Sequence, residues 1–323
     1  MSQARAQLVF PEMSDVPRTG QPIQLNSALL AALVSVFRGA NQVAIRYALT
    51  AFAPLWTAFG RMAVSCVTVF IWTRFRGVSL RLTSAEWLQF AVLGAVFTIQ
   101  ISLLHWGADL TTPGYAVVLI NTNPIFASLI SHFFVPGDRL SRRRLAGLAV
   151  AFAGVCAVFF GRPDPTLATR PTLGNTMITI SGAMVGARTV YIQRLVQKID
   201  PAKAVIWQML ISLPCFALGG LLLGGHAGRD PFNWQAIAAV TYQGVIVGGV
   251  ALVLWVHLLR RHTPGSLTVF SFLTPVFGVV LSSVAFNESI TARFVVGLAC
   301  VIAGIALVNW RERSAKSYPT APA

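Results

Sequence analysis

Ten apolar runs, each about as long as a bilayer is thick, follow one another along this chain with only short connections between them. They cover residues 27–47, 54–73, 86–108, 113–134, 142–160, 173–193, 202–223, 234–258, 264–285 and 292–310. In lipid every backbone polar group needs a partner within the protein, so a run of about 20 apolar residues crosses as a helix. Only 11% of the residues are charged, against roughly a quarter in soluble domains. The sequence therefore predicts an all-α integral membrane protein with ten transmembrane helices.

Basic residues are distributed unevenly between the two sides of the predicted membrane. Most of the 25 Lys and Arg residues fall in tails and loops of one side, as at 74–81 and 139–144. The connections on the other side carry Arg46, Arg162, Arg170, Arg229 and Arg293. Because cytoplasmic loops are enriched in Lys and Arg, this predicts a multi-pass protein of the bacterial cytoplasmic (inner) membrane with both termini in the cytoplasm. The basic residues are concentrated in every second connection between spans, which a nucleic-acid surface would not require. The charge of +15 therefore does not indicate a nucleic-acid partner.

The two ends of the chain, 1–26 and 311–323, are predicted to be cytoplasmic tails. The first segment has charged residues and prolines but no long apolar run, so we expect the first helix to direct membrane insertion in place of a signal peptide. The cysteines Cys66, Cys156, Cys215 and Cys300 lie in apolar runs without metal-ligand spacing. No Walker loop, dinucleotide-binding glycine pattern or HExxH pattern occurs in the sequence. We therefore expect no cofactor, no metal and no catalytic residues.

The two halves of the chain repeat a set of turn and helix residues. Thr112-Pro113-Gly114 matches Thr263-Pro264-Gly265, Pro124 matches Pro275, Asp138 matches Glu288, Arg143 matches Arg293, Gly147 matches Gly297 and Gly154 matches Gly304. An odd number of crossings separates the matched helices, so they traverse the membrane in opposite directions. This predicts two inverted five-helix repeats, 27–161 and 173–310, joined by an external linker, 162–172. Inverted repeats hold a solute site between them near the midplane.

The repeat residues also carry a resemblance. In the second half they are Leu254-Trp255, Arg260-Arg261, Thr263-Pro264-Gly265, Pro275, Asn287-Glu288-Ser289, Arg293, Gly297 and Gly304; in the first half they are Phe37-Arg38-Gly39-Ala40-Asn41, Pro54 and Arg61. With these residues, the chain over about 27–310 resembles the drug/metabolite transporter superfamily with paired EamA domains. The resemblance implies a ten-helix permease that carries small metabolites and is not an enzyme. The chain departs from the family pattern at Arg38, where many members have a tryptophan.

Three arginines, Arg38, Arg61 and Arg188, fall within the predicted spans. Inserting a charged side chain at the bilayer centre costs about 2.5–3.5 kcal/mol of free energy, so such a residue is expected to line a cavity, to have a partner or to serve a function. Arg61 is typical of the family and has the alternative of hydrogen-bonding to carbonyls of a neighbouring helix; Arg188 has the alternative of snorkelling to the interface. No Asp or Glu lies in the middle third of any span. A net positive interior favours an anionic or zwitterionic solute, bound by its carboxylate or phosphate.

A set of polar residues from several spans is predicted to line the solute site. The set consists of Arg38, Asn41, Gln100, Asn123, Arg188, Tyr191, Ser271 and Thr274. Asn41 and Gln42 share a helix face with Arg38. The stripe of small residues that contains Ser271 and Thr274 has helix packing as its alternative.

Other residues in the spans have more ordinary interpretations. Pro124 and Pro275 are candidate hinges, with simple helix curvature as the alternative. His105, Trp106, Trp255 and His257 lie close to predicted helix ends, which favours a role as interfacial anchors.

The prediction for function is a secondary transporter that exports amino acids or related anionic or zwitterionic metabolites by alternating access. Its partners would be a small-molecule solute and the lipid bilayer, with no nucleic acid, and it would act as a monomer or a homodimer. The alternative is a membrane-embedded enzyme acting on a phosphorylated lipid or isoprenoid, in which Arg38 and Arg188 bind the phosphate. That alternative lacks an acid, base or nucleophile near the two arginines.

Overall fold

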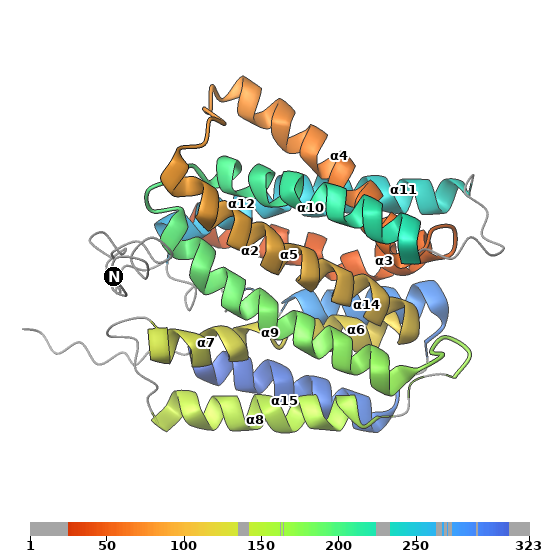
Figure 1. Ribbon diagram of the computed structural model, residues 1–323. Helices are drawn as coiled ribbons and strands as arrows, with labels where there is room; N and C mark the ends of the chain where they lie inside the picture. Colours follow the sequence, from red (N-terminus) through yellow and green to blue (C-terminus); the bar gives the residue numbers. More distant parts are fainter. Residues whose placement is uncertain are drawn as a thin grey trace, which may run out of the picture.

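The computed structural model describes residues 25–134, 142–161, 163, 165–223, 233–262, 267, 270, 273–288 and 290–309. Regular structure in these residues is entirely helical. The helices lie side by side with their axes in broadly one direction, as Figure 1 shows. In that view α4 and α10 lie near one edge of the bundle, and α8 and α15 form the opposite edge.

The helices overlap the predicted apolar runs, some as single helices and some interrupted, while most of 264–272 in the ninth run lies outside the described residues. Their bounds are α2 Leu25–Gly39, α3 Asn41–Leu49, α4 Pro54–Phe75, α5 Ser84–Leu110, α6 Pro113–Ile120, α7 Asn123–Phe134, α8 Arg142–Phe159, α9 Pro171–Leu195, α10 Pro201–Leu223, α11 Trp234–Tyr242, the π-helix η1 Gln243–Ala251, α12 Leu252–Arg261, α14 Leu273–Phe286 and α15 Ala292–Asn309. Among the described residues, six helical stretches are long and apolar enough to cross a membrane: Leu25–Leu49, Pro54–Phe75, Glu86–Leu110, Pro113–Ile130, Pro201–Leu223 and Trp234–Leu259. The apolar helices Leu273–Phe286 and Ala292–Gly304 are shorter.

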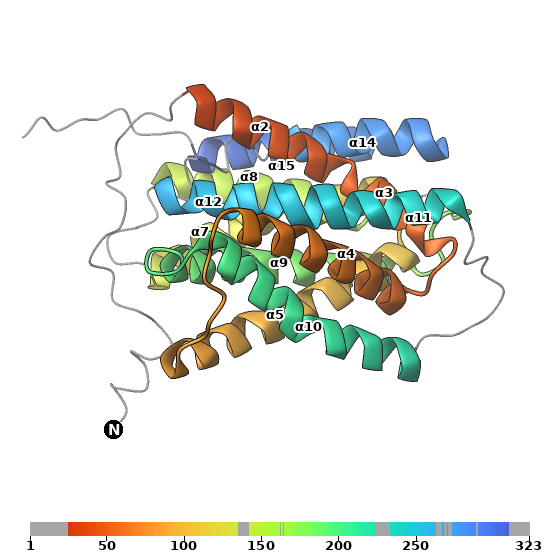
Figure 2. The ribbon, with the colours of Figure 1, turned by 90° about the horizontal axis from the view of Figure 1, so that it is seen from above.

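The first predicted span is interrupted at Ala40, between α2 and α3. Its neighbour Gly39 lies directly against α14, where a Cβ on the glycine would be 2.9 Å from the Thr274 carbonyl oxygen. Gly278 makes the reciprocal approach, since a Cβ there would be 2.9 Å from the Gly39 carbonyl oxygen. Two glycines thus let α2 and α14 pack backbone to backbone, which is how small residues act in membrane helices. Figure 2 shows α14 following the line of α2 on one face of the bundle.

The fourth predicted span is interrupted at Asn121 and Thr122, between α6 and α7, and Pro124 is the second residue of α7. A proline cannot donate a backbone hydrogen bond, so carbonyls before it need other partners. Polar side chains at the break supply them. Asn121 Nδ2 donates to the Val117 carbonyl at 2.6 Å, Thr122 Oγ1 donates to the Leu119 carbonyl at 2.7 Å, and Asn123 Nδ2 donates to the Ile120 carbonyl at 3.0 Å.

The eighth predicted span contains a π-helix, η1, between α11 and α12. Its glycines face α4, because a Cβ on Gly244 would run into Val64 and one on Gly249 would approach Thr68. Ser65 Oγ donates to the Gly244 carbonyl at 2.9 Å, so a side chain of α4 supports the π-helical backbone. π-helical turns are often found at functional sites.

Helices α8 and α15 pack closely along their length, side by side in Figures 1 and 2. A Cβ on Gly154 would be 2.6 Å from the Gly297 carbonyl oxygen, and one on Gly304 would be 2.5 Å from the Ala151 Cβ. Three of these positions, Gly154, Gly297 and Gly304, belong to the sequence repeat. The repeat therefore marks residues that bring helices of the two halves together.

A second link between the halves is made by Glu288, in the turn after α14. Its carboxylate is buried and accepts hydrogen bonds from the Gly114 backbone N–H at 2.9 Å and from the hydroxyls of Thr112 and Ser282. The carboxylate thus caps the first turn of α6, where free N–H groups and the helix dipole favour negative charge.

Candidate functional site

The candidate site is a layer of polar side chains inside the bundle, and its three arginines come from three helices. Arg38 is on α2, Arg61 on α4 and Arg188 on α9. They lie close enough for their positive charges to repel one another: Arg61 interacts with Arg38, and Arg188 interacts with both. Among the described residues, none of the three arginines forms an ion pair with a carboxylate, since the pair found there joins Lys203 to Glu86.

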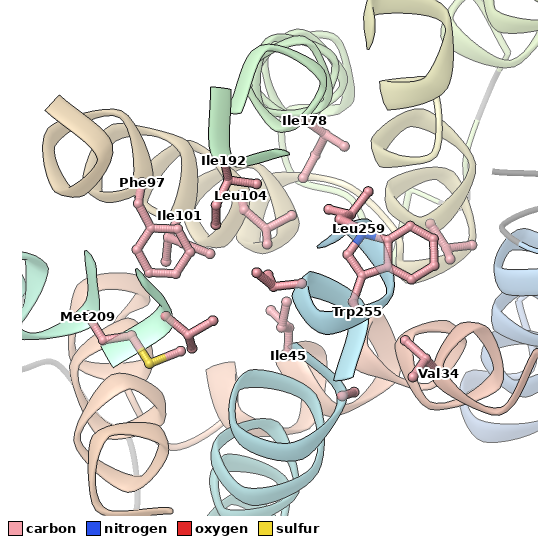
Figure 3. Packing of buried hydrophobic residues seen from close by; sticks show 14 of the residues in the cluster. Val34, Ile45, Phe97, Ile101, Leu104, Ile178, Ile192, Met209, Trp255 and Leu259 are labelled. Atoms are coloured by element: carbon pink, nitrogen blue, oxygen red, sulfur yellow. The ribbon is translucent and has the colours of Figure 1, made fainter. Parts of the chain in front are cut away.

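Arg38 and Arg188 each lie over an aromatic ring. The Arg38 guanidinium carbon is 5.2 Å from the centre of the Trp255 ring, and that of Arg188 is 4.8 Å from the centre of the Phe97 ring. Such cation–π contacts contribute about 0.5–2 kcal/mol, depending on burial. Phe97 and Trp255 belong to one buried cluster, shown in Figure 3 with Ile101, Leu104 and Leu259. Both arginines are half-buried, and their contacts with these buried rings place the guanidinium groups inside the bundle.

Arg188 is also hydrogen-bonded within the bundle. Its Nη1 donates to Gln208 Oε1 of α10 at 3.0 Å, and Gln208 is fully buried. Its Nε makes no hydrogen bond to the protein. The snorkelling alternative is therefore wrong for Arg188, because aromatic and amide contacts hold its head group inside the bundle.

Arg61 is the most deeply buried of the three arginines, with 7% of its surface exposed. Its Nε and Nη1 have no hydrogen-bond partner in the protein. The carbonyl-bonding alternative is therefore wrong for these two donors. A buried guanidinium with unpaired donors is costly, so water or an anion is needed to complete its hydrogen bonds.

Neutral amides in the same layer also have unused acceptors. Asn41 Oδ1, Gln42 Oε1, Gln100 Oε1 and Gln243 Oε1 are buried without a hydrogen-bond partner in the protein. The amide nitrogens of two of them are used to join helices: Gln100 Nε2 donates to Ser181 Oγ at 2.9 Å, and Gln243 Nε2 donates to the Ala44 carbonyl at 3.2 Å. Buried acceptors without partners are uncommon in proteins, so the layer offers both cationic donors and neutral acceptors to a bound molecule.

The remaining predicted site residues make hydrogen bonds to backbone carbonyls. Asn123 donates to the preceding turn at 3.0 Å, Tyr191 Oη donates to the Gln89 carbonyl at 3.2 Å, and Thr274 Oγ1 donates to the Ser35 carbonyl at 3.0 Å. Ser271 lies outside the described residues. Within the described part of the stripe, Thr274 and its neighbours pack against other helices, which is the alternative the sequence left open. Pro124 follows the break before α7, and Pro275 lies buried in the first turn of α14.

Sequence reasoning missed two aromatic residues of the layer. His105 is fully buried, with Nδ1 2.9 Å from the Ile101 carbonyl, and its charge environment includes Arg61. Trp255 is 7% exposed and lies under Arg38. The prediction that these two are interfacial anchors is wrong, because both side chains are buried among other helices of the bundle. A signal was available for Trp255, which lies six residues before the end of α12 and thus about 9 Å inside it.

Comparison with known proteins identifies the family. The model of the EamA-like transporter family matches residues 25–160 and again residues 172–310. The chain belongs to this family. Its members are transporters, so this EamA-family protein is a multi-pass membrane protein of the transporter class, and the family gives no support for an enzyme.

Relatives of this EamA-family protein agree with that assignment. An "Uncharacterized transporter" of Archaeoglobus fulgidus is 24% identical over 285 residues, which cover 88% of this chain and 97% of the relative. A "Probable amino-acid metabolite efflux pump" of Salmonella typhimurium is 25% identical over 287 residues, which cover 85% of this chain and 92% of the relative. A solved crystal structure, 19% identical, superposes with a TM-score of 0.68 over 88% of this chain and 97% of the other, which shows a shared fold.

Proposed function

We propose that this EamA-family protein is a secondary transporter that exports amino acids or related anionic or zwitterionic metabolites by alternating access. The observation that carries the proposal is the positive polar layer, in which three arginines without a carboxylate partner meet buried amide acceptors without hydrogen bonds. A zwitterion offers a carboxylate to the guanidinium groups and an ammonium to the amide oxygens. The name of the Salmonella relative, an efflux pump for amino-acid metabolites, supports the same class of solute.

The solute would bind with its carboxylate near Arg38 and Arg188. Arg38 and Arg188 are half-buried, whereas Arg61 is almost completely covered. The rings of Trp255 and Phe97 limit the space next to the two arginines and provide an apolar surface for a side chain of the solute. Asn41 and Gln100 would receive the ammonium through their unpaired oxygens.

The architecture proposed for this function is ten crossings in two inverted halves, 27–161 and 173–310, with the linker 162–172 outside. The support is the sequence repeat together with the glycine contacts of α8 with α15 and the bonds from Glu288 to Thr112 and Gly114. Transport would follow when one half tilts relative to the other and exposes the polar layer first to one side of the membrane and then to the other. Pro124 and Pro275, matched in the repeat, are proposed as hinges.

The placement proposed in the cell is the cytoplasmic (inner) membrane of a bacterium, with the tails 1–26 and 311–323 in the cytoplasm. The distribution of Lys and Arg between loops supports this orientation. The proposed partners are the solute and the bilayer, with no nucleic acid and no cofactor. Monomer and homodimer are both compatible with a site that lies within one chain.

The test starts from cells that lack the protein and cells that overproduce it. Metabolites are compared without a target list in medium and cytoplasm, and the solute that moves outward with protein abundance is then tested in reconstituted vesicles. We expect flux of an amino acid or a related carboxylate, which requires a sealed vesicle. Absence of flux for every member of a broad panel of amino acids and organic acids, with correctly inserted protein, contradicts the proposal. Product formation in detergent, without a vesicle, would instead support the membrane-enzyme alternative.

A further inference from the structure

A polar pocket of about 420 Å³ lies at one end of the bundle. None of its lining residues belongs to the polar layer of Arg38, Arg61 and Arg188, called the arginine layer below. It is formed by the segment between α4 and α5 together with the turn between α9 and α10. Its lining residues are Arg76, Gly77, Val78, Ser79, Glu86, Lys198, Ile199, Asp200 and Lys203. This is the end that the distribution of Lys and Arg assigns to the cytoplasm.

Both carboxylates of the pocket are already occupied by bonds within the protein. Glu86 accepts two hydrogen bonds from Lys203 Nζ, at 2.8 and 2.9 Å, and a third from the Thr83 backbone N–H at 2.8 Å. Asp200 Oδ1 accepts from the Ala202 backbone N–H at 2.8 Å at the start of α10. With Lys203 paired to Glu86, the pocket keeps the positive charges of Arg76 and Lys198 against the single negative charge of Asp200, a net charge of +1. Arg76 and Lys198 are both exposed and without an ion pair in the part of the chain that the structure describes.

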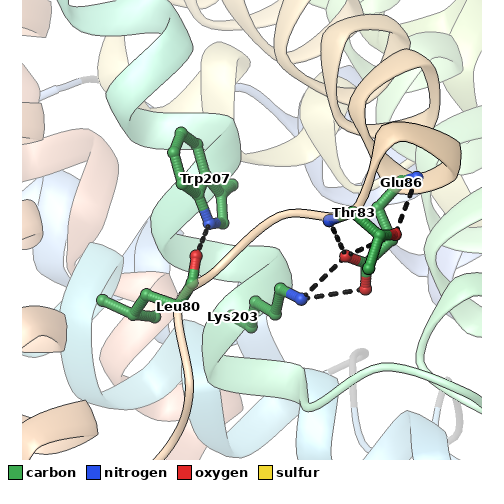
Figure 4. A network of polar contacts seen from close by, with 5 residues as sticks. All are labelled: Leu80, Thr83, Glu86, Lys203 and Trp207. Carbon is green, nitrogen blue, oxygen red and sulfur yellow. Dashed lines mark hydrogen bonds and ion pairs between the residues drawn. The ribbon is translucent and has the colours of Figure 1, made fainter.

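The walls of the pocket are held in place before any ligand arrives. Figure 4 shows the Lys203–Glu86 pair joining α10 to α5, and the Trp207 indole N–H donating to the Leu80 carbonyl at 2.9 Å. The turn at Gly77 adopts a positive φ of 63°, which glycine permits without strain. The Val78 backbone N–H donates to the Thr73 carbonyl at 3.0 Å, so the segment is tied back to α4. A pre-formed polar wall reduces the ordering cost of binding.

Large apolar side chains flank the pocket and face outward. Phe75, directly before Arg76, is 87% exposed, and Trp87, directly after Glu86, is 55% exposed. In a membrane protein such residues contact acyl chains or the headgroup region. The pocket therefore opens where a lipid headgroup meets its hydrocarbon tails.

We propose that this pocket binds the phosphate of an anionic phospholipid from the adjacent leaflet, with Arg76 and Lys198 as its ligands and Phe75 and Trp87 against the acyl chains. The net charge of +1 in the pocket matches the single negative charge of a phosphodiester, and guanidinium suits its oxygens in particular. The inference does not depend on which solute the protein carries, because none of these residues belongs to the arginine layer.

The test is native mass spectrometry of the purified full-length protein after exchange into phosphatidylglycerol or phosphatidylcholine. We expect wild type to retain phosphatidylglycerol in preference to phosphatidylcholine. The double variant Arg76→Gln/Lys198→Gln should bind phosphatidylglycerol roughly 25-fold more weakly, since each Lys or Arg near an anionic lipid contributes about a fivefold factor. The matched control is Arg74→Gln/Arg81→Gln, which removes the same charge from exposed residues of the same region that do not line the pocket.

Three outcomes overturn the proposal. Equal loss of lipid in the two double variants would show a diffuse charge effect. No loss in Arg76→Gln/Lys198→Gln would show that lipid binds elsewhere. Inorganic phosphate that displaces phosphatidylglycerol at millimolar concentration and stabilises the wild type to the same extent would assign the pocket to a free anion. Thermal unfolding of each variant confirms that it is folded before lipid binding is compared.

Discussion

The carboxylate of Glu288 lies 2.9 Å from the backbone nitrogen of Gly114, a residue 174 positions earlier in the chain. Glu288 therefore joins the turn after α14 to the first turn of α6. There is no room for a larger residue at position 114, since a Cβ would be 2.8 Å from a carboxylate oxygen of Glu288. Both residues belong to the sequence repeat, where Gly114 matches Gly265 and Glu288 matches Asp138, but the repeat does not predict that Gly114 and Glu288 are in contact.

Replacing Glu288 should destabilise the protein. The Glu288→Ala variant leaves the buried hydroxyls of Thr112 and Ser282 and the Gly114 N–H without their acceptor, which we expect to lower the free energy of unfolding by about 2–3 kcal/mol. The measurement is thermal unfolding in detergent. Ser283→Ala is the control, because the Ser283 hydroxyl makes only a 3.4 Å bond to the Glu288 backbone carbonyl. Equal melting temperatures for Glu288→Ala and Ser283→Ala would contradict the role assigned to the carboxylate.

Replacing Arg38 should weaken solute binding. Arg38→Ala removes the charge, and we expect the apparent affinity for a carboxylate-bearing solute to fall by about tenfold or more, as for a lost charge-assisted hydrogen bond. Arg38→Lys keeps the charge but loses the planar fork and its stacking on Trp255, so its affinity should lie between those of wild type and Arg38→Ala. Transport is measured at matched membrane abundance. Unchanged affinity in both variants would exclude Arg38 from the site.

Enlarging Gly154 should separate α8 from α15. In Gly154→Leu the new side chain meets the Gly297 carbonyl oxygen, which is already 2.6 Å from the position of a Cβ. We expect overpacking to cost about 1–3 kcal/mol and to lower the melting temperature. Ala153→Leu adds a side chain of the same kind one residue earlier, at a position exposed on the outer surface of α8, and should leave stability nearly unchanged. The predicted packing is wrong if the two variants melt alike.

Reporter fusions test the proposed orientation. A reporter inserted in the segment 139–144 should be active only on the cytoplasmic side, and one inserted at 162–172 only on the outer side. The physical reason is that a cluster of arginines resists translocation across the membrane. Arg142→Gln/Arg143→Gln/Arg144→Gln should weaken this preference and produce a mixture of orientations for the fusion. An external reporter at 139–144 in the wild-type chain would reverse the predicted topology.

Local sequence patterns were sufficient for the positions of the helices. The runs predicted at 54–73, 86–108 and 202–223 coincide within a few residues with α4, α5 and α10. Lipid exposure and backbone hydrogen bonding act on each segment separately, so hydropathy over about 20 residues identifies a helix without knowledge of its neighbours. The same patterns did not predict the π-helix at Gln243–Ala251, because its backbone is supported from another helix by Ser65.

For the candidate site, the sequence identified charged residues that lipid alone cannot accommodate but not what surrounds them. Arg38, Arg61 and Arg188 were found because charge in an apolar run is rare and costly. Their environment depends on residues far away in the chain: Trp255 under Arg38, Phe97 under Arg188 and Gln208 beside it.

The sequence by itself determined that this chain is helical, belongs in a membrane and carries excess positive charge among its apolar segments. Each of these properties follows from composition within single segments. The tertiary structure decided which polar groups form hydrogen bonds between packed helices and which remain unpaired. Thr274 hydrogen-bonds to a neighbouring helix, whereas Arg61 keeps two unpaired donors. The difference is set by the contacts between helices, because a hydroxyl or a guanidinium is satisfied only by the atoms that folding brings within about 3 Å of it.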